Sequence, residues 1–244
     1  MYDLENFTRE NMYDCAIKLR NMDVGAKDME EIANRMVHYL YENLIDRKTK
    51  QPACALVRCF KTHPYGRLDA ALQASAREIL EGRPITANTK CLTLLATMGD
   101  EPQWNSRQFS TGHKAIPLID EDFVERAPMI SQLIHQFGLR INTVLEPDIA
   151  TLVDLYHMSF NVFYIPEALG SPHIPAQSEF VIPYQIKSVL GFGGMLPSGD
   201  LLALILFSKS RISRDTASLF KWISAYVRIA ASSYDRETVL AGSK

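Results

Sequence analysis

The sequence lacks the features that mark several large classes of protein. Its 244 residues contain no apolar run near the roughly 20 residues that a helix needs to cross a bilayer. The opening stretch, Met1 to Glu5, is too acidic and polar for a signal peptide. The formal net charge is only -2, with no concentrated basic patch of the kind that binds nucleic acid. We therefore expect a cytoplasmic protein that binds neither membranes nor nucleic acid.

Cysteine is scarce, and the four present are Cys15, Cys54, Cys59 and Cys91. Four cysteines in a chain of this length are not a disulfide framework, which favours a reducing compartment. Cys54 and Cys59 should point to opposite faces of a regular strand, so together with His63 they make a poor metal site. Buried apolar thiols are expected, while a reactive Cys59 or Cys91 remains the alternative.

Catalytic motifs are missing as well. The sequence has no Walker lysine loop, no Gly-x-Ser-x-Gly, no His-Glu-x-x-His and no kinase, cyclase or phosphatase pattern. The carboxylates at Glu101 and at 120–122 fit helix-cap and loop positions better than a general acid and base. The sequence therefore predicts no catalytic residue and a protein that is not an enzyme.

What is present is the composition of a globular protein with a core, 47% hydrophobic and 22% charged. No linker or internal repeat divides the chain. Apolar residues recur at helical spacing in several stretches, the first capped by Thr8 and the last by Ser213. The spacing predicts helices over 8–24, 28–44, 68–80, 120–137 with a break at Pro128, 148–157, and from Ser213 onward.

Apolar runs bounded by turns predict the strands. These strands span 53–61, 91–98, 115–119, 161–165, 188–196 and 201–208. The last two flank a turn at Pro197–Asp200, and the final strand is apolar on both faces, so it should lie inside the sheet. We expect an α/β (α+β) fold, with a central, mostly antiparallel sheet and helices packed on it.

The C-terminal third resembles the end of a GAF domain. Ser188-Val189-Leu190-Gly191-Phe192 and 201–208 are similar to that family's last two strands, and Arg211-Ile212-Ser213-Arg214-Asp215 is similar to the entry into its last helix. The helix predicted over 28–44 sits where the family's first helix would. Stretches such as 60–66 and 188–200 also resemble the N-terminal sensory region of bacterial sensor histidine kinases.

The resemblance implies one GAF-like sensory domain over 1–244, with an N-terminal helical extension (1–24), a pocket-covering segment (99–183) and a C-terminal transmitter helix (209–235). Such a domain would bind a small ligand on one face of the sheet. A homodimer would then relay the ligand state through its terminal helices to an output module, such as the histidine kinase of a two-component system. No cofactor is indicated. The alternatives are an interaction module without a ligand and a cysteine-based redox sensor or reductase.

Arg58 is the strongest single candidate for a ligand-binding residue. It should share a strand face with Leu56 and Phe60, both of which we expect to be buried. A buried guanidinium needs an anionic partner. That partner is either a carboxylate of the protein or the carboxylate or phosphate of a ligand, held bidentately.

The other candidates surround the middle of the chain. Trp104, with Arg107 and Phe109, could cover a pocket as an aromatic lid. His113 follows a glycine at the start of a predicted strand, where a loop histidine can reach a ligand, and Tyr184 could offer its hydroxyl. For each of them, an ordinary structural role is the alternative.

Phe192 lies among three glycines, Gly191, Gly193 and Gly194. Glycine within a strand indicates a bulge or the close approach of another group, which is either a packed helix or a ligand. The predicted ligand-binding residues are thus Arg58, Trp104, His113, Tyr184 and Phe192.

Overall fold

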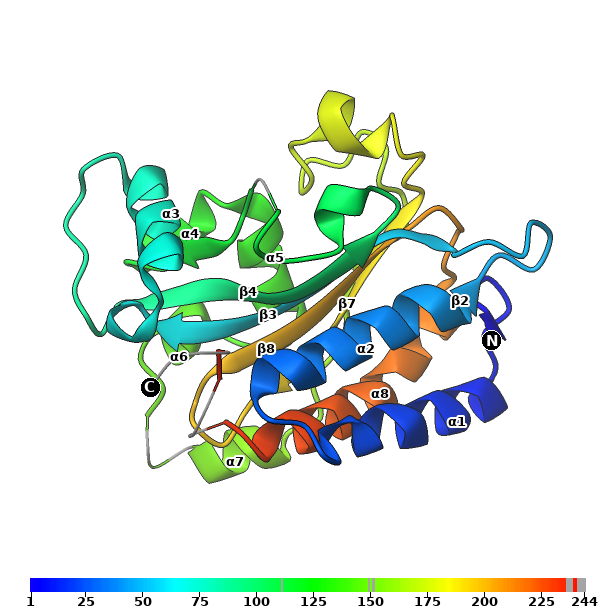
Figure 1. Cartoon of the computed structure of the whole chain (residues 1–244), viewed down its shortest axis with the longest axis horizontal. Coiled ribbons are helices and arrows are strands. Elements are labelled where there is room, and N and C mark those ends of the chain that lie inside the picture. Colours follow the sequence, from blue (N-terminus) through cyan, green and yellow to red (C-terminus); the bar gives the residue numbers. More distant parts are fainter. Residues whose placement is uncertain (111, 149, 151, 236–238, 241–244) are drawn as a thin grey trace.

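A six-stranded antiparallel sheet crosses the centre of the molecule, with helices packed on both of its faces (Figure 1). The computed structural model describes residues 1–110, 112–148, 150, 152–235 and 239–240. The predicted α+β class, with a mostly antiparallel sheet covered by helices, is confirmed.

The strands follow the order β5-β4-β3-β8-β7-β6 across the sheet. Their bounds are β3 Cys54–Pro64, β4 Lys90–Gly99, β5 Ala115–Pro117, β6 Phe163–Ile165, β7 Ser188–Met195 and β8 Leu201–Ser208. The apolar strand β8 lies between β3 and β7, as its sequence predicts. A parallel pair outside this sheet, β1 (Tyr2–Asp3) with β2 (Leu44–Ile45), was not expected from the sequence.

Each helix predicted from the periodicity is found among the described residues, and α6 is an additional short helix. They are α1 Arg9–Arg20, α2 Met29–Asn43, α3 Ala70–Leu80, α4 Glu121–Glu125, α5 Pro128–Gln136, α6 Ile141–Leu145, α7 Leu152–His157 and α8 Arg214–Ser232. Pro128 opens α5, which explains the break after α4. Helix α6 and a π-turn at Gln177–Val181 were not predicted. Residues 149 and 151 of the predicted helix 148–157 lie outside the described residues.

Local capping explains where the long helices begin. The side chains of Thr8, Asp28 and Ser213 each accept a hydrogen bond from a backbone amide in the first turn of α1, α2 and α8. In α8 the inward stripe is Phe220, Ile223, Val227 and Ala230, all fully buried. The spacing of three or four residues keeps this stripe on the sheet.

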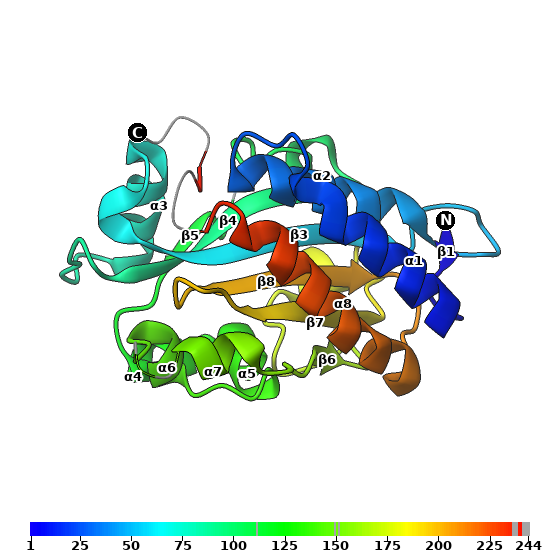
Figure 2. The same cartoon turned by 90° about the horizontal axis from the view of Figure 1, so that it is seen from below.

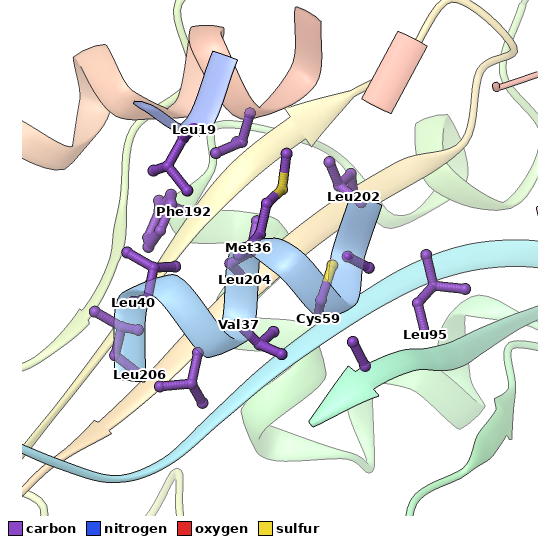
Figure 3. Close-up of a cluster of buried hydrophobic side chains, with 14 of the residues drawn as sticks. Leu19, Met36, Val37, Leu40, Cys59, Leu95, Phe192, Leu202, Leu204 and Leu206 are labelled. Atoms are coloured by element: carbon purple, nitrogen blue, oxygen red, sulfur yellow. The ribbon is translucent and has the colours of Figure 1, made fainter. Parts of the chain in front are cut away.

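The two faces of the sheet carry different kinds of cover. Figures 1 and 2 show α1, α2 and α8 crossing one face, which we call the helix face. Side chains of α2, including Met36, Val37 and Leu40, pack there on residues of β3 and β8 (Figure 3). Apolar residues of α4, α5 and α6 cover the other face, which we call the loop face because the irregular middle of the chain lies there.

Strand β3 differs from its predicted form in two ways. It continues to Pro64, which pairs with Lys90, whereas the sequence predicts a loop from His63. A register shift between Cys54 and Leu56 also rotates the start of the strand. Because of that bulge, Cys54 packs on the helix face together with Cys59, and the prediction that the two point to opposite faces is wrong.

The glycines of β7 admit aromatic rings and one helix contact. A Cβ on Gly194 would lie 2.2 Å from the Phe160 ring, and one on Gly191 would lie 3.1 Å from Phe163. At Gly193 the backbone amide donates to Ser224 Oγ of α8 at 3.2 Å, but a Cβ there would lie 2.1 Å from the Leu202 carbonyl of the neighbouring strand β8. The glycines therefore permit close packing of protein groups.

Among the described residues, no helix is both long and apolar enough to cross a membrane.

Truncating Phe220 tests the packing of α8 on the sheet. Phe220 is fully buried, with its ring centroid 5.1 Å from those of Phe7 and Phe192. We expect Phe220→Ala to lower the free energy of unfolding by about 3–5 kcal/mol. Trp222→Ala, on the same helix but 65% exposed, should change it by no more than about 0.5 kcal/mol. Equilibrium denaturation of the monomer would measure both, and equal losses would contradict the assigned orientation of α8.

Candidate functional site

Arg58 lies in the middle of β3 and points to the loop face. Its neighbours two residues away, Leu56 and Phe60, pack in the loop-face core, as the sequence predicts. Across the ladder, Arg58 pairs with Thr97 of β4 and Ile205 of β8. The residue therefore occupies a central position of the sheet, with an apolar surrounding on its own strand.

The guanidinium of Arg58 lacks a counter-charge among the described residues. Within the described part of the chain, its one hydrogen bond runs from Nη2 to Ser110 Oγ at 3.1 Å, and its buried Nε has no partner. Burial alone lowers the pKa of Arg58, to about 10. Of the two partners that the sequence left open, a carboxylate of the protein is not found among the residues that the structure describes.

Arg228 of α8 is another buried guanidinium, and its Nε likewise has no hydrogen-bond partner. Arg228 donates to three backbone carbonyls, those of Tyr156, Met158 and Met195. It also lies over the rings of Tyr156 and Phe160, at 5.5 and 4.8 Å from their centroids. Arg58 has one neutral hydroxyl among the described residues in place of these five contacts, so its guanidinium has fewer protein partners than that of Arg228.

Thr97 adds a second unpartnered polar group beside Arg58. The residue is fully buried, and its Oγ1 has no hydrogen-bond partner. Because Ala96 and Met98 pack on the helix face, Thr97 points to the loop face with Arg58. Buried donors and acceptors in folded proteins are nearly always paired. Arg58 and Thr97 thus place two unpartnered polar groups on paired residues of the loop face.

His113 borders the same place from the middle segment. Partial burial, and then the positive charge of Arg58, lower the pKa of His113. Its imidazole is therefore neutral at pH 7 and offers one N–H donor. The backbone at His113 has a positive φ of 57°, which turns the chain directly after Gly112. His113 therefore lies near enough to Arg58 for the charge of the guanidinium to act on its imidazole.

Trp104 and Tyr184 form a pair of their own on the loop face. Their ring centroids are 4.6 Å apart, and Phe180 of the π-turn lies 5.7 Å from each. Burial, and then the charge of the nearby Glu101 carboxylate, raise the pKa of Tyr184. Trp104 is itself nearly buried, beneath the π-turn. These rings form the apolar cover of the face.

The predicted lid of Trp104, Arg107 and Phe109 is not assembled as one unit. Arg107 makes two short bonds to the Glu30 carboxylate of α2, with Nε–Oε1 at 2.7 Å and Nη2–Oε2 at 2.9 Å. Phe109 is 69% exposed. Arg107 therefore anchors the segment that carries Ser110 and His113 to α2, and Phe109 lies at the surface.

Phe192 does not belong with the other four predicted residues. It is fully buried on the helix face, against Phe220 of α8. The physical reason is strand alternation, since Gly191 and Gly193 occupy the loop-face positions on either side. Thr97 and Ser110 were missed by the sequence analysis, although a threonine within the apolar run 91–98 was a usable signal.

No protein-family model matches this chain, and no curated protein matches it.

A second polar cluster, on the helix side of the sheet end, was also missed. Lys61 of β3 is fully buried and pairs with Asp200 at 2.5 Å and Asp235 at 3.6 Å. Lys90 pairs with Asp200 at 3.1 Å, and Ser198 donates from its backbone N and its Oγ to Asp235 at 2.6 and 2.8 Å. The cluster joins β3, β4, the β7–β8 turn and the chain after α8. Its charges balance, so it requires no ligand.

Asp200 in this cluster and the nearby His63 have shifted pKa values that affect stability. Burial would raise the pKa of Asp200, but the positive charges of Lys61 and Lys90 lower it overall. Burial, and then the charge of Lys61, lower the pKa of His63 to about 4. The pKa values of the four cysteines change in the opposite direction, because burial raises the pKa of each thiol to about 12.

Acid should destabilise the protein through His63. Unfolded His63 takes up its proton near pH 6.5 and the folded residue only near pH 4, so the unfolded state binds more protons between these values. Stability is complete above pH 6.5 and falls as the pH drops through this window, by about 2 kcal/mol from pH 7 to pH 5. Unfolding titrations of His63→Leu should show a smaller loss, and an equal loss would exclude His63 as the source. The contribution of Asp200 should disappear only below about pH 4.

Thiol labelling tests the burial of the cysteines. Cys15, Cys54, Cys59 and Cys91 are all buried and free. A neutral thiol is a poor nucleophile, so Ellman's reagent should label the native protein negligibly at pH 8 and label all four thiols in guanidinium chloride. Rapid labelling of one thiol in the native protein would instead support the alternative of a cysteine-based redox sensor or reductase.

Proposed function

We propose that the chain is a non-catalytic signal-input domain of the GAF-like type, which binds a small ligand on the loop face. The observation that carries this proposal is Arg58, a guanidinium in the middle of the sheet with a single neutral partner. Thr97, unpartnered and opposite Arg58, adds to it. Both groups lie on the face that the middle segment covers, which is where the resemblance to GAF domains implies a pocket.

The architecture supports a relay across the sheet. Strand β3 carries Arg58 on the loop face and Cys59 on the helix face, where the thiol packs beneath α2 (Figure 3). The arginine is therefore one residue away from a side chain in the α2 contact. A ligand that shifts β3 would act on the helices by favouring one of two arrangements.

The outer surface of α1 and α8 supports a homodimer. Four large apolar side chains on it are exposed by 44–65%, and these are Tyr13 and Ile17 of α1 and Trp222 and Ile229 of α8. Apolar side chains gathered on one surface mark interaction sites more often than isolated ones do. The two helices run parallel, with Ser233 bonded to Asp23 where both end.

A groove of about 830 Å³ between the first turns of α1 and α8 adds detail to this surface. It includes Tyr13 and Trp222, and it is flanked by Arg9 of α1 and Asp215 of α8. In a two-fold dimer each chain presents the same patch to its copy. Arg9 can then meet Asp215 of the partner copy, so the surface is complementary to itself in charge as well as in apolar character.

The two tryptophans of the chain allow a direct test of the relay. Trp104 lies beneath the loop-face cover and Trp222 lies on the outer surface of α8. Two variants, Trp222→Phe and Trp104→Phe, each keep one reporter. A library of carboxylates, phosphates, nucleotides and neutral amides would be screened by tryptophan emission. We expect a compound that changes Trp104 emission also to change that of Trp222, although the residues lie on different faces.

The outcomes separate the candidate functions. A response of Trp104 without any response of Trp222 would show a ligand site that is not coupled to α8. If neither tryptophan responds to any compound, while acrylamide quenching of Trp222 falls as the protein concentration rises, an interaction module without a ligand would replace the proposal.

A further inference from the structure

We infer that the loop-face site takes a small monocarboxylate with an apolar body, bound through its carboxylate to Arg58 and Thr97. This inference rests on the proposed function and names the ligand class of the same site. It follows from the charge of the site, from its free hydrogen-bonding groups and from the apolar residues around Arg58.

The charge of the site favours a monoanion. Arg58 supplies one positive charge, and no ion pair joins it to a carboxylate of the described residues. His113 is neutral at pH 7, because partial burial and the charge of Arg58 lower its pKa. A single carboxylate would therefore neutralise the site, whereas a phosphate dianion would bring one negative charge too many into a partly buried place.

The free hydrogen-bonding groups match the two oxygens of a carboxylate. Nη2 of Arg58 donates to Ser110 Oγ, and this leaves the buried Nε–H without a partner. The fork of a guanidinium binds carboxylates through two parallel N–H groups. Thr97 Oγ1, on the residue paired with Arg58, can donate a further hydrogen bond. Arg58 and Thr97 together would thus satisfy a carboxylate and lose their own unpartnered atoms.

The surroundings of Arg58 favour an apolar body on the ligand. Leu56 and Phe60 flank it on β3, and Ile205 lies across from it on β8. All three are at most 5% exposed and belong to the loop-face core. A ligand that reaches Arg58 therefore meets apolar side chains, so branched-chain or aromatic carboxylates fit better than acetate.

The unpartnered groups of Arg58 and Thr97 should destabilise the protein without its ligand. Apolar substitutions at these two positions should therefore stabilise it. Replacing an uncompensated buried group by an apolar one of similar shape is often stabilising. Arg58→Met and Thr97→Val should therefore raise the melting temperature of the free protein by a few degrees. A residue with a purely structural role would give the opposite sign.

The experiment titrates the full chain with isobutyrate and benzoate. Calorimetry and thermal shift would report binding, with benzamide and inorganic phosphate as the neutral and dianionic controls. We expect saturable binding of at least one carboxylate and at least about 10-fold weaker binding of both controls. Arg58→Met should abolish binding, and Arg58→Lys and Thr97→Val should weaken it by about 10-fold or more.

Thr93→Val is the matched control on the same strand. Thr93 Oγ1 donates to the carbonyl of Cys91 at 3.1 Å, so it has a partner. This variant should lower the melting temperature and leave carboxylate binding unchanged, which is the reverse of Thr97→Val on both counts.

Several results would overturn the inference. These are phosphate binding as tight as that of the carboxylate, carboxylate binding that survives Arg58→Met, or a fall in the melting temperature of Thr97→Val. If neither carboxylate binds but another compound changes the emission of Trp104 and Trp222, the ligand class is wrong and the proposed function stands. If no compound binds at all, both are wrong.

Discussion

The pairing of β3 with both β4 and β8 is the constraint on which the rest of the molecule depends. This strand lies at the centre of the sheet, and its side chains supply both cores. Polar residues of β3 are therefore placed in the interior of the protein together with the apolar ones. Lys61 and Arg58, three residues apart on β3, are therefore placed where charge is costly unless it is paired.

Lys61 and Arg58 differ in the partners that surround their charges. Lys61 lies among Asp200, Asp235 and Ser198, which bind the chain after α8 to the end of the sheet. Arg58 faces a threonine without a partner and a single serine hydroxyl. A buried ion cluster of balanced charge fits a structural role, whereas an unbalanced one is a usual mark of a functional site. The contrast within one strand is the basis of the proposed ligand site.

Much of the fold could be predicted from local signals, but the composition of the site could not. Capping by Thr8, Asp28 and Ser213 and the apolar periods define the helices, while alternation places Arg58 with Leu56 and Phe60. The bulge near Cys54 could not be predicted, because register depends on the partner strand. Thr97, Ser110 and the cluster around Lys61 depend on contacts between residues far apart in the sequence, from 39 positions for Arg58 and Thr97 to 174 for Lys61 and Asp235. Phe192 was misassigned because the faces of a glycine-rich strand are poorly marked in sequence.

The most direct test of the central claim is the side-chain ¹H–¹⁵N resonance of Arg58 Nε, recorded with and without benzoate. Arg107, whose Nε already donates to Glu30 at 2.7 Å, provides the internal reference for a paired guanidinium. The account predicts that the Arg58 signal moves on addition of benzoate toward the position of a carboxylate-bound arginine, while that of Arg107 stays in place. An Arg58 signal that is already at the paired position without benzoate, and does not move, would contradict the account.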